Sequence, residues 1–320
     1  MKEFAIIDNF FKPRSYQRKD VLLGIGDDCA ITSVPEGQNL VVTTDTLLSG
    51  VHFLPDTPAA AIAHKAVAVN LSDLAAMGAE PAWISLSISL PDANQAWIDE
   101  FSKALFELTE YYSVQLIGGD TVQGPLAITI TAQGFVPQGQ ALTRSKAKPG
   151  DLVYVTGTLG DAGAGLAIAQ GKLEASRTSS DFLLNRLHYP TPRLLAGTAV
   201  RRIANACIDI SDGLLADLNH ILHSSKCGAM IQVERLPLSI ALKEAVSEEQ
   251  AINYALTAGD DYELLFTVSE EQKGNLDIAQ ANFHFEATCI GQLSGAVGKC
   301  DIKHADQPFI IKADGYEHFA

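Results

Sequence analysis

The sequence predicts a two-domain α/β protein, and three observations lead to that fold class. Stretches that alternate in the manner of half-buried strands are interleaved with stretches whose apolar residues recur at helical spacing. A chain of 320 residues is too long for one typical core and suits two domains of ordinary size. The segment KAKPGD at 146–151 interrupts the periodic pattern, so we expect domains at 1–145 and 146–320.

The first domain is expected to alternate strands with helices. The helix that follows residue 57 ends where Gly78 and then Pro81 stop it. The next stretch, WISLSISL, alternates apolar residues with serine, which is typical of a half-buried strand. In chain order, we expect strand 39–48, helix 58–77, strand 83–90, helix 97–112 and strands 114–118 and 126–136.

The second domain is expected to open with the strand LVYVTG and to continue the alternation. Its expected strands are 152–157, 206–210, 228–233, 262–268 and 286–292, and its expected helices are 161–170 and 212–224. A content of 47% hydrophobic and 19% charged residues fits a globular protein and argues against disorder.

The charge and the cysteines exclude several classes of protein. The formal net charge is −15 and no run of Lys or Arg occurs, so a nucleic-acid backbone would be repelled. No run of about 18 apolar residues occurs, and Glu3 and Asp8 interrupt the apolar N-terminal stretch, so we expect neither a membrane span nor a signal peptide. The five scattered cysteines fit reduced thiols of a cytoplasmic protein.

The most informative pattern is the placement of aspartates in short, mostly glycine-containing segments near the ends of expected strands. These segments are GIGDDCA (24–30), TTDT (43–46), NLSDLAAMGA (70–79), GGDT (118–121), DISDGL (209–214) and GDDYEL (259–264). One Asp-Gly pair is an ordinary turn signal. Carboxylates that converge repel one another, however, unless cations neutralise them.

Magnesium suits such a set, because it prefers hard oxygen ligands and bridges carboxylates to phosphates. Glycines let backbone N–H groups approach phosphate oxygens without a Cβ in the way. No pairing of a nucleophile with a base is evident, which favours direct phosphoryl transfer by positioning and charge neutralisation. The segment GTLGDAGAGLA at 157–167 either cradles phosphate at a helix N-terminus or merely begins the helix.

Taken together, the motifs resemble those of the thiamine-monophosphate kinase family. NLSDLAAMGA is shared with a wider superfamily that includes aminoimidazole-ribonucleotide synthetase, selenophosphate synthetase and the hydrogenase-maturation dehydratase, whereas GIGDD combined with GDDYEL is more specific to the kinase. The similar segments follow that family's order over essentially the whole chain: GIGDDCA, TTDT, HKAVAVNLSDLAAMGAEP, LIGGDT, LTRSKAKPGD, VTGTLGD, DISDGL, GDDYEL and GYEHF.

The resemblance implies a fold like that of aminoimidazole-ribonucleotide synthetase, with an N-terminal αβ domain whose sheet pairs across a homodimer and a C-terminal αβ domain. It also implies several Mg²⁺ ions, ATP as co-substrate and thiamine monophosphate as acceptor. The implied reaction is in-line transfer of the γ-phosphate to give thiamine diphosphate, without a phosphoenzyme.

The resemblance further implies roles for residues of this chain. The implied metal-binding residues, one threonine acting through its backbone, are Asp28, Thr43, Thr44, Asp45, Asp73, Asp120, Asp209 and Asp212. The implied nucleotide-binding residues are Gly119, Asp120, Arg144 and Ser211. The implied substrate-binding residues are His52, Asp260 and Tyr316, and the implied catalytic residues are Asp73, Asp120 and Arg144.

One substrate-side position departs from the family's pattern. Many relatives have glutamate where this chain has Asp260, and the shorter side chain withdraws the carboxylate by one methylene group. Either Asp260 keeps the contact, or a water or Asp261 takes it over. The ring of Tyr316 suits a cationic thiazolium through cation–π attraction.

Two other interpretations remain open at this point. A selenophosphate synthetase would need a cysteine or selenocysteine in an N-terminal glycine-rich loop, and the dehydratase would need a C-terminal cysteine, whereas Cys29 follows GIGDD and the sequence ends in GYEHFA. A non-catalytic dimer that binds magnesium and nucleotide would tolerate the loss of carboxylates, whereas the acidic set is complete apart from Asp260.

Overall fold

The computed structural model describes residues 2–14 and 16–311, and the chain divides into two compact units. The first unit contains the described residues up to Leu74 together with Ala79–Gly139. The second contains Ala75–Gly78 and the described residues from Gln140 onward. Within the described part of the chain, no helix has both the length and the hydrophobicity of a membrane span.

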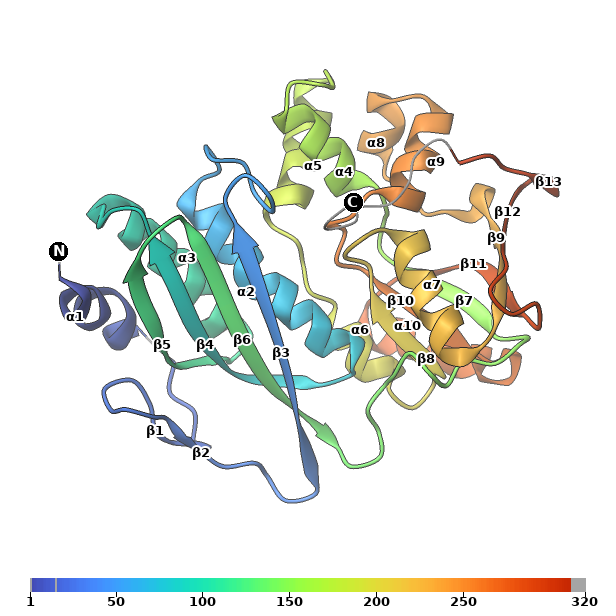
Figure 1. The fold of residues 1–320 in the computed structure, drawn as a ribbon. Coiled ribbons are helices and arrows are strands. Elements are labelled where there is room, and N and C mark those ends of the chain that lie inside the picture. Colours follow the sequence, from blue (N-terminus) through green and yellow to red (C-terminus); the bar gives the residue numbers. More distant parts are fainter. Residues whose placement is uncertain (1, 15, 312–320) are drawn as a thin grey trace. The chain divides into compact units, whose positions relative to one another are not determined.

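The first unit is a four-stranded sheet with helices on one face (Figure 1). Its strands, in spatial order, are β3 (Gln38–Leu48), β6 (Ala127–Pro137), β4 (Glu80–Leu90) and β5 (Gln115–Gln123). β4 and β5 are parallel, while β6 is antiparallel to both of its neighbours. The helices that cover the sheet are α2 (Ala59–Ala76) and α3 (Gln95–Tyr111).

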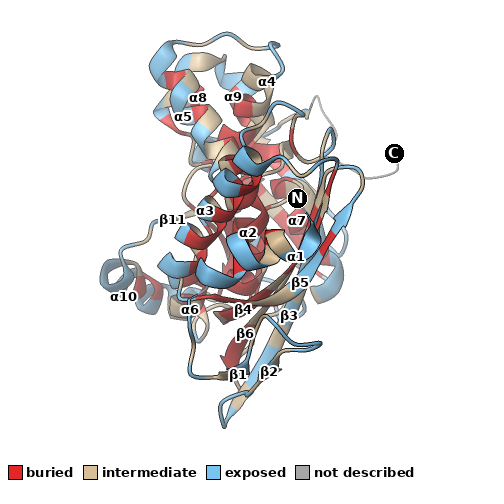
Figure 2. Ribbon diagram, turned by 90° about the vertical axis from the view of Figure 1, so that its left-hand side faces the viewer, coloured by how far each residue is buried: buried red, intermediate tan, exposed pale blue. Residues whose placement is uncertain are grey.

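The alternation along β4 determines which of its residues face these helices. Ile84, Leu86 and Ile88 are almost fully buried, whereas Ser85 and Ser87 lie between them on the uncovered face. That uncovered face also carries exposed apolar side chains on the two edge strands, at Leu40, Val42, Leu48 and Val122. Figure 2 accordingly shows much of β3 as exposed, while the strands behind it are largely buried.

The predicted strands and helices of the first domain are confirmed, but one of the polar segments lies elsewhere than expected. Thr43, Thr44 and Asp45 lie inside β3, as the expected strand 39–48 had them, whereas Gly119 and Asp120 lie inside β5, so the prediction that GGDT ends its strand was wrong. Backbone pairing with β6 and β4 continues past them. Polar side chains at these positions do not interrupt the ladder, because the ladder is formed by backbone groups alone.

A short helical segment precedes this sheet, where the sequence analysis expected no element. It consists of α1 (Glu3–Ile6), the π-helical turn η1 (Ile7–Phe11) and the 3₁₀ turn η2 (Lys12–Arg14). Its buried residues are Ile6, Phe10 and Phe11. Arg14 donates to Asp99 at 2.9 Å and to Ser102 at 3.1 Å, which ties the segment to α3. The small hairpin of β1 (Val21–Leu23) and β2 (Ile31–Thr32) follows.

The second unit is built on a seven-stranded sheet in the order β13-β12-β9-β11-β7-β10-β8. The strands are β7 (Leu152–Thr156), β8 (Ala206–Asp209), β9 (Gly228–Gln232), β10 (Leu264–Val268), β11 (Ala287–Ser294), β12 (Cys300–His304) and β13 (Gln307–Pro308). The helices are α4 (Asp161–Ala169), α5 (Arg177–His188), α6 (Leu194–Val200), α7 (Leu214–Ser225), α8 (Ile240–Ala245), α9 (Glu248–Thr257) and α10 (Lys273–Phe283), with 3₁₀ turns η3 (Val233–Arg235) and η4 (Glu270–Gln272).

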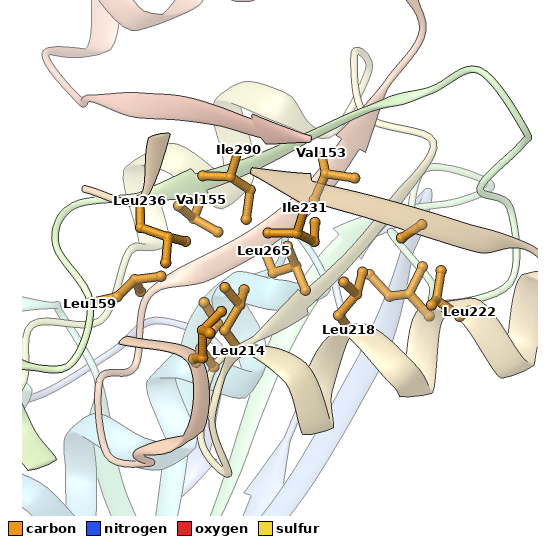
Figure 3. Packing of buried hydrophobic residues seen from close by; sticks show 14 of the residues in the cluster. Val153, Val155, Leu159, Leu214, Leu218, Leu222, Ile231, Leu236, Leu265 and Ile290 are labelled. Atoms are coloured by element: carbon orange, nitrogen blue, oxygen red, sulfur yellow. The ribbon is translucent and has the colours of Figure 1, made fainter. Parts of the chain in front are cut away.

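The core of this unit forms where α7 packs on the sheet. Leu214, Leu218 and Leu222 recur at intervals of four along α7 and point toward strand residues such as Val153 and Ile231 (Figure 3). The expected strands and helices of this domain are confirmed. The sequence analysis missed α5, α6, α8, α9, α10, β12 and β13.

Candidate functional site

A cavity of about 720 Å³ in the first unit brings together two of the predicted metal-binding aspartates. Asp28 reaches it from the loop between β1 and β2, and Asp120 reaches it from β5. Both side chains belong to exposed residues. The cavity is also lined by Phe4, Ile7, Asp8, Phe11, Lys12, Ile25, Gly26, Asp27, Cys29, Ala30, Ser85, Leu86, Leu116, Ile117, Gly118, Gly119 and Thr121.

Gly119 is the one position on β5 where only glycine fits. Its φ of +154° lies at the edge of the range that side chains rarely adopt, and a Cβ would collide with the backbone carbonyl of Leu86 on β4. At Gly118, by contrast, a Cβ would meet no atom within 4 Å. The close approach of β4 therefore requires glycine at 119, and Gly119 also lines the cavity beside Asp120.

A second pair of predicted residues meets at the opposite edge of the sheet. The hydroxyl of Thr43 on β3 donates a short hydrogen bond to the half-buried carboxylate of Asp73 on α2. Asp45 lies two residues beyond Thr43 and so faces the same, helix-covered side. Thr44 faces the other side, where its hydroxyl is 2.8 Å from that of Thr131.

The two sets lie on opposite edges, because β6 and β4 separate β3 from β5. With strands about 4.8 Å apart, the edges are separated by roughly 14 Å. Among the described residues, no group of three His, Cys, Asp or Glu side chains lies close enough to hold a metal ion. The first unit thus brings Asp28 together with Asp120, and Asp73 together with Thr43, but it does not bring the two pairs together.

His52 closes the turn that follows β3. Its Nδ1 accepts a hydrogen bond from the backbone N–H of Leu48 at 3.0 Å, and its carbonyl accepts one from the ammonium of Lys65 at 3.1 Å. The bond to Nδ1 makes that nitrogen an acceptor, so a neutral ring carries its proton on Nε2.

In the second unit, the loop after β8 is held by a buried carboxylate that the sequence analysis did not identify. Asp217 on α7 accepts hydrogen bonds from the backbone N–H groups of Ser211 at 3.0 Å and Asp212 at 3.1 Å. Burial, mainly, raises the pKa of Asp217 to about 7, and the nearby charge of Arg144 acts in the opposite direction. Arg144 is exposed, and its own carbonyl accepts from Ser225 at 2.7 Å.

The substrate-side segment GDDYEL runs beside the same loop. Asp260 donates its N–H to the carbonyl of Ser211 at 2.9 Å, which places it next to the DISD residues, whose Asp209 is buried. Asp260 and Tyr262 both adopt positive φ, at +69° and +50°. The hydroxyl of Tyr262 donates to the carboxylate of Asp260 at 3.0 Å, so the side chain of Asp260 has a defined orientation.

The next carboxylate along the segment has a structural position. Asp261 is buried, accepts a hydrogen bond from the N–H of Gly160 at 2.7 Å, and has a pKa raised well above its usual range by that burial. This hydrogen bond satisfies the N–H of Gly160, the N-cap residue of α4. A helix begins at Asp161 as expected, and the phosphate cradle at 157–167 stays a prediction.

A buried ionic cluster anchors the end of this segment, and the sequence analysis missed it too. Glu263 is fully buried, and burial alone would raise its pKa, but Arg193 at 2.5 Å and Arg186 at 2.8 Å outweigh that effect and lower it. Thr156 also donates to this carboxylate at 2.6 Å. No spacing rule links residues 107 positions apart, so only the fold could reveal the cluster. Tyr316 lies outside the described residues.

Family models match most of the chain. Residues 26–136 match the AIR synthase related protein N-terminal domain, and residues 148–298 match the C-terminal domain of the same family.

Individual relatives and solved structures show members of this family to which the chain is similar in sequence and fold. The chain is 52% identical to the thiamine-monophosphate kinase of Escherichia coli K12, over 99% of this chain and 98% of that protein. It resembles the crystal structure of thiamine-monophosphate kinase from Stenotrophomonas maltophilia K279a, with a TM-score of 0.88, 43% identity, and coverage of 97% of this chain and 98% of the other. It also resembles AaThiL complexed with AMPPCP and TMP, with a TM-score of 0.79, 33% identity and 92% coverage of each chain.

Proposed function

Because the chain belongs to the thiamine-monophosphate kinase family of AIR synthase related proteins, we propose that it transfers the γ-phosphoryl group of ATP to thiamine monophosphate. The observation that carries this proposal is the 52% identity over essentially the full length of a curated kinase. The relative solved with AMPPCP, an ATP analogue, and TMP supports the same pair of substrates.

The reaction requires no covalent intermediate with the protein. A phosphate oxygen of thiamine monophosphate attacks the γ-phosphorus of ATP, and the bond from that phosphorus to the β,γ-bridging oxygen breaks. The products are thiamine diphosphate and ADP. The attacking oxygen is already anionic, so the protein needs to align the two phosphates, neutralise their charge and exclude water.

We propose that several Mg²⁺ ions serve this reaction. The donor set fits, since Asp28 and Asp120 present carboxylates to one cavity and Thr43 with Asp73 adds hard oxygens at the other sheet edge. Magnesium bound there would offset the negative charge of the phosphates. The other proposed ligands are Thr44, Asp45, Asp209 and Asp212. The hydroxyl of Thr44 is hydrogen-bonded to that of Thr131, and we assign the ligand role of Thr44 to its backbone carbonyl.

The proposed nucleotide contacts are supported by local geometry in each unit. Gly119 presents backbone beside Asp120 in the cavity. In the second unit, Asp217 holds the loop that carries Ser211, and the charge of Arg144 reaches the same carboxylate. Arg144 is the proposed cation for the transferring phosphate.

On the substrate side, we propose His52, Asp260 and Tyr316 as contacts for thiamine monophosphate. The hydrogen bond from Tyr262 and the positive φ at Asp260 support a direct role for Asp260, since they hold its carboxylate in one orientation. Asp261 is a poor substitute, because its carboxylate is buried against Gly160.

We also propose that the enzyme is a homodimer whose active sites each use both copies. Asp28 and Asp120 lie at the β5 edge, and Asp73 and Thr43 lie at the β3 edge. Placing the β3 edge of a second copy beside the β5 edge of the first would unite the two sets. If both such edges pair, so that the two sheets close into a barrel, the exposed apolar residues Val42 and Val122 on the uncovered face would point inward and be buried. The free thiols of all five cysteines support a cytoplasmic location.

A product assay tests the proposed function. Purified protein is incubated with ATP, Mg²⁺ and thiamine monophosphate, and thiamine diphosphate is separated and quantified, with parallel reactions that lack Mg²⁺ or contain free thiamine. We expect diphosphate only from the monophosphate and only with Mg²⁺. ATP binding without this product would instead indicate a superfamily enzyme with another acceptor, or a nucleotide sensor.

A further inference from the structure

The N-terminal helical segment forms one wall of the cavity that contains Asp28 and Asp120. The residues that it contributes recur at helical spacing along one stripe: Phe4, Ile7, Asp8, Phe11 and Lys12. A neighbouring stripe, Ile6 and Phe10, is buried and does not line the cavity, and Phe11 of the first stripe is buried as well. The segment therefore packs through these three residues and presents the rest of the first stripe to the cavity.

Lys12 is the feature of this wall that points to a ligand. Its ammonium nitrogen lies 3.2 Å from the position that a Cβ on Gly26 would occupy, so it reaches the glycine-rich loop just before Asp27 and Asp28. Among the described residues that line the cavity, Lys12 is the one lysine or arginine, whereas Asp8, Asp27, Asp28 and Asp120 are acidic. Gly26, with φ of +128°, leaves the space that the lysine occupies.

We propose that Lys12 binds the polyphosphate of the nucleotide directly, and that the stripe containing Phe4 and Ile7 forms the apolar wall beside its nucleoside. This inference rests on the proposed function, because it takes the cavity to be the nucleotide site. Lys12 and Phe4 are eight residues, or roughly two helical turns, apart on the segment. The charged and the apolar contacts thus lie at opposite ends.

The excess of carboxylates in the cavity explains why a lysine there would help to bind an anionic nucleotide. Four carboxylates facing one cavity would repel an anionic nucleotide. Magnesium offsets carboxylates where it binds them, and a fixed ammonium adds a positive group that donates hydrogen bonds to phosphate oxygens. Lys12 is well placed for this, because Arg14 in the same turn binds Asp99 on α3 and so limits where the segment can lie.

The test compares a ligand that has phosphates with one that has none. Affinities of AMPPCP and of adenosine are measured by calorimetry, with adenosine in competition format, at saturating Mg²⁺. The variants are Lys12→Ala, Lys12→Arg and, as a matched loss of one exposed lysine that does not line the cavity, Lys19→Ala. Thiamine diphosphate formation by the wild-type protein is measured alongside.

We expect Lys12→Ala to lower the affinity for AMPPCP by roughly tenfold or more, as the loss of a hydrogen bond to a charged group does. The affinity for adenosine should not change. Lys12→Arg should restore most of the affinity, and Lys19→Ala should match the wild type. Phe4→Ala should lower the affinity for both AMPPCP and adenosine.

Two results would overturn the inference. One is wild-type affinity for AMPPCP in Lys12→Ala, and the other is an equal loss for adenosine and AMPPCP in that variant, which would mean that Lys12 only shapes the wall. Either result would leave the proposed kinase activity intact if the wild type forms product. Conversely, the wild-type protein could form no thiamine diphosphate while Lys12→Ala still weakens AMPPCP binding. That result would reject the proposed kinase activity and keep the inference about Lys12.

Discussion

At the residue scale, the contact between Thr43 and Asp73 joins a strand to the helix that covers it. We predict that Asp73→Asn abolishes turnover while the fold is kept. Asparagine preserves the shape and an oxygen acceptor for Thr43, but it removes the negative charge proposed to bind magnesium. The measurement is kcat at saturating ATP and Mg²⁺, with circular dichroism and the unfolding midpoint as controls. Near-normal turnover would refute the assignment.

Asp217 gives a prediction about pH, because its pKa of about 7 in the folded protein lies far above the usual value of 3.8. Between those values the folded state binds more protons than the unfolded state, so its contribution to stability falls as pH rises from about 4 to 7. Each pKa unit corresponds to about 1.4 kcal/mol, so the total effect is on the order of a few kcal/mol.

The variant Asp217→Asn isolates this effect, because it keeps an acceptor for the N–H groups of Ser211 and Asp212 but does not titrate. We expect its stability relative to the wild type to rise between pH 4 and 7 and to level off above 7. Urea unfolding at a series of pH values measures the difference. A difference that does not change with pH would mean that Asp217 does not titrate in this range.

At the element scale, β5 contains two adjacent glycines whose surroundings differ. We predict that Gly119→Ala destabilises the protein by about 1–3 kcal/mol or more, since its Cβ would strike the backbone of Leu86, which cannot move without disturbing β4. Gly118→Ala is the matched control, because a Cβ there meets nothing within 4 Å. The urea unfolding midpoints of the two variants are compared, and we expect that of Gly119→Ala to be the lower. Equal midpoints would show that β4 and β5 separate easily.

The elements that could be predicted from sequence are those with a clear period. The alternation in WISLSISL gave β4, and the spacing of Phe101, Leu105 and neighbouring apolar residues gave α3. The N-terminal segment was missed, because it is only twelve residues long and its turns change from α to π to 3₁₀. Its role as a cavity wall depends on contacts with residues about 100 positions away.

At the scale of the whole molecule, the separation of the two sets of acidic residues bears on the assembly. If each active site takes Asp120 from one copy and Asp73 from the other, two inactive variants should complement each other. We predict that Asp120→Asn mixed with Asp73→Asn regains activity after subunit exchange. About a quarter of the wild-type activity is expected, because half of the randomly paired dimers are mixed and each of those has one intact site.

This mixing experiment has internal controls. Each variant alone should stay inactive, and a variant mixed with itself should gain nothing. Light scattering of the wild type reports the oligomeric state, which should be a dimer. A dimer that exchanges its subunits but recovers no activity would place both aspartates of a site in the same copy.

The sequence by itself determined the fold class and the family, because periodicity and short motifs are local properties of a chain. Asp28, Asp73 and Asp120 could all be proposed as metal ligands from their motifs alone. Only the tertiary structure decided which of them meet. Strand order places Asp120 with Asp28 and puts Asp73 at the far edge, and that order follows from backbone pairing and burial between segments far apart in the chain.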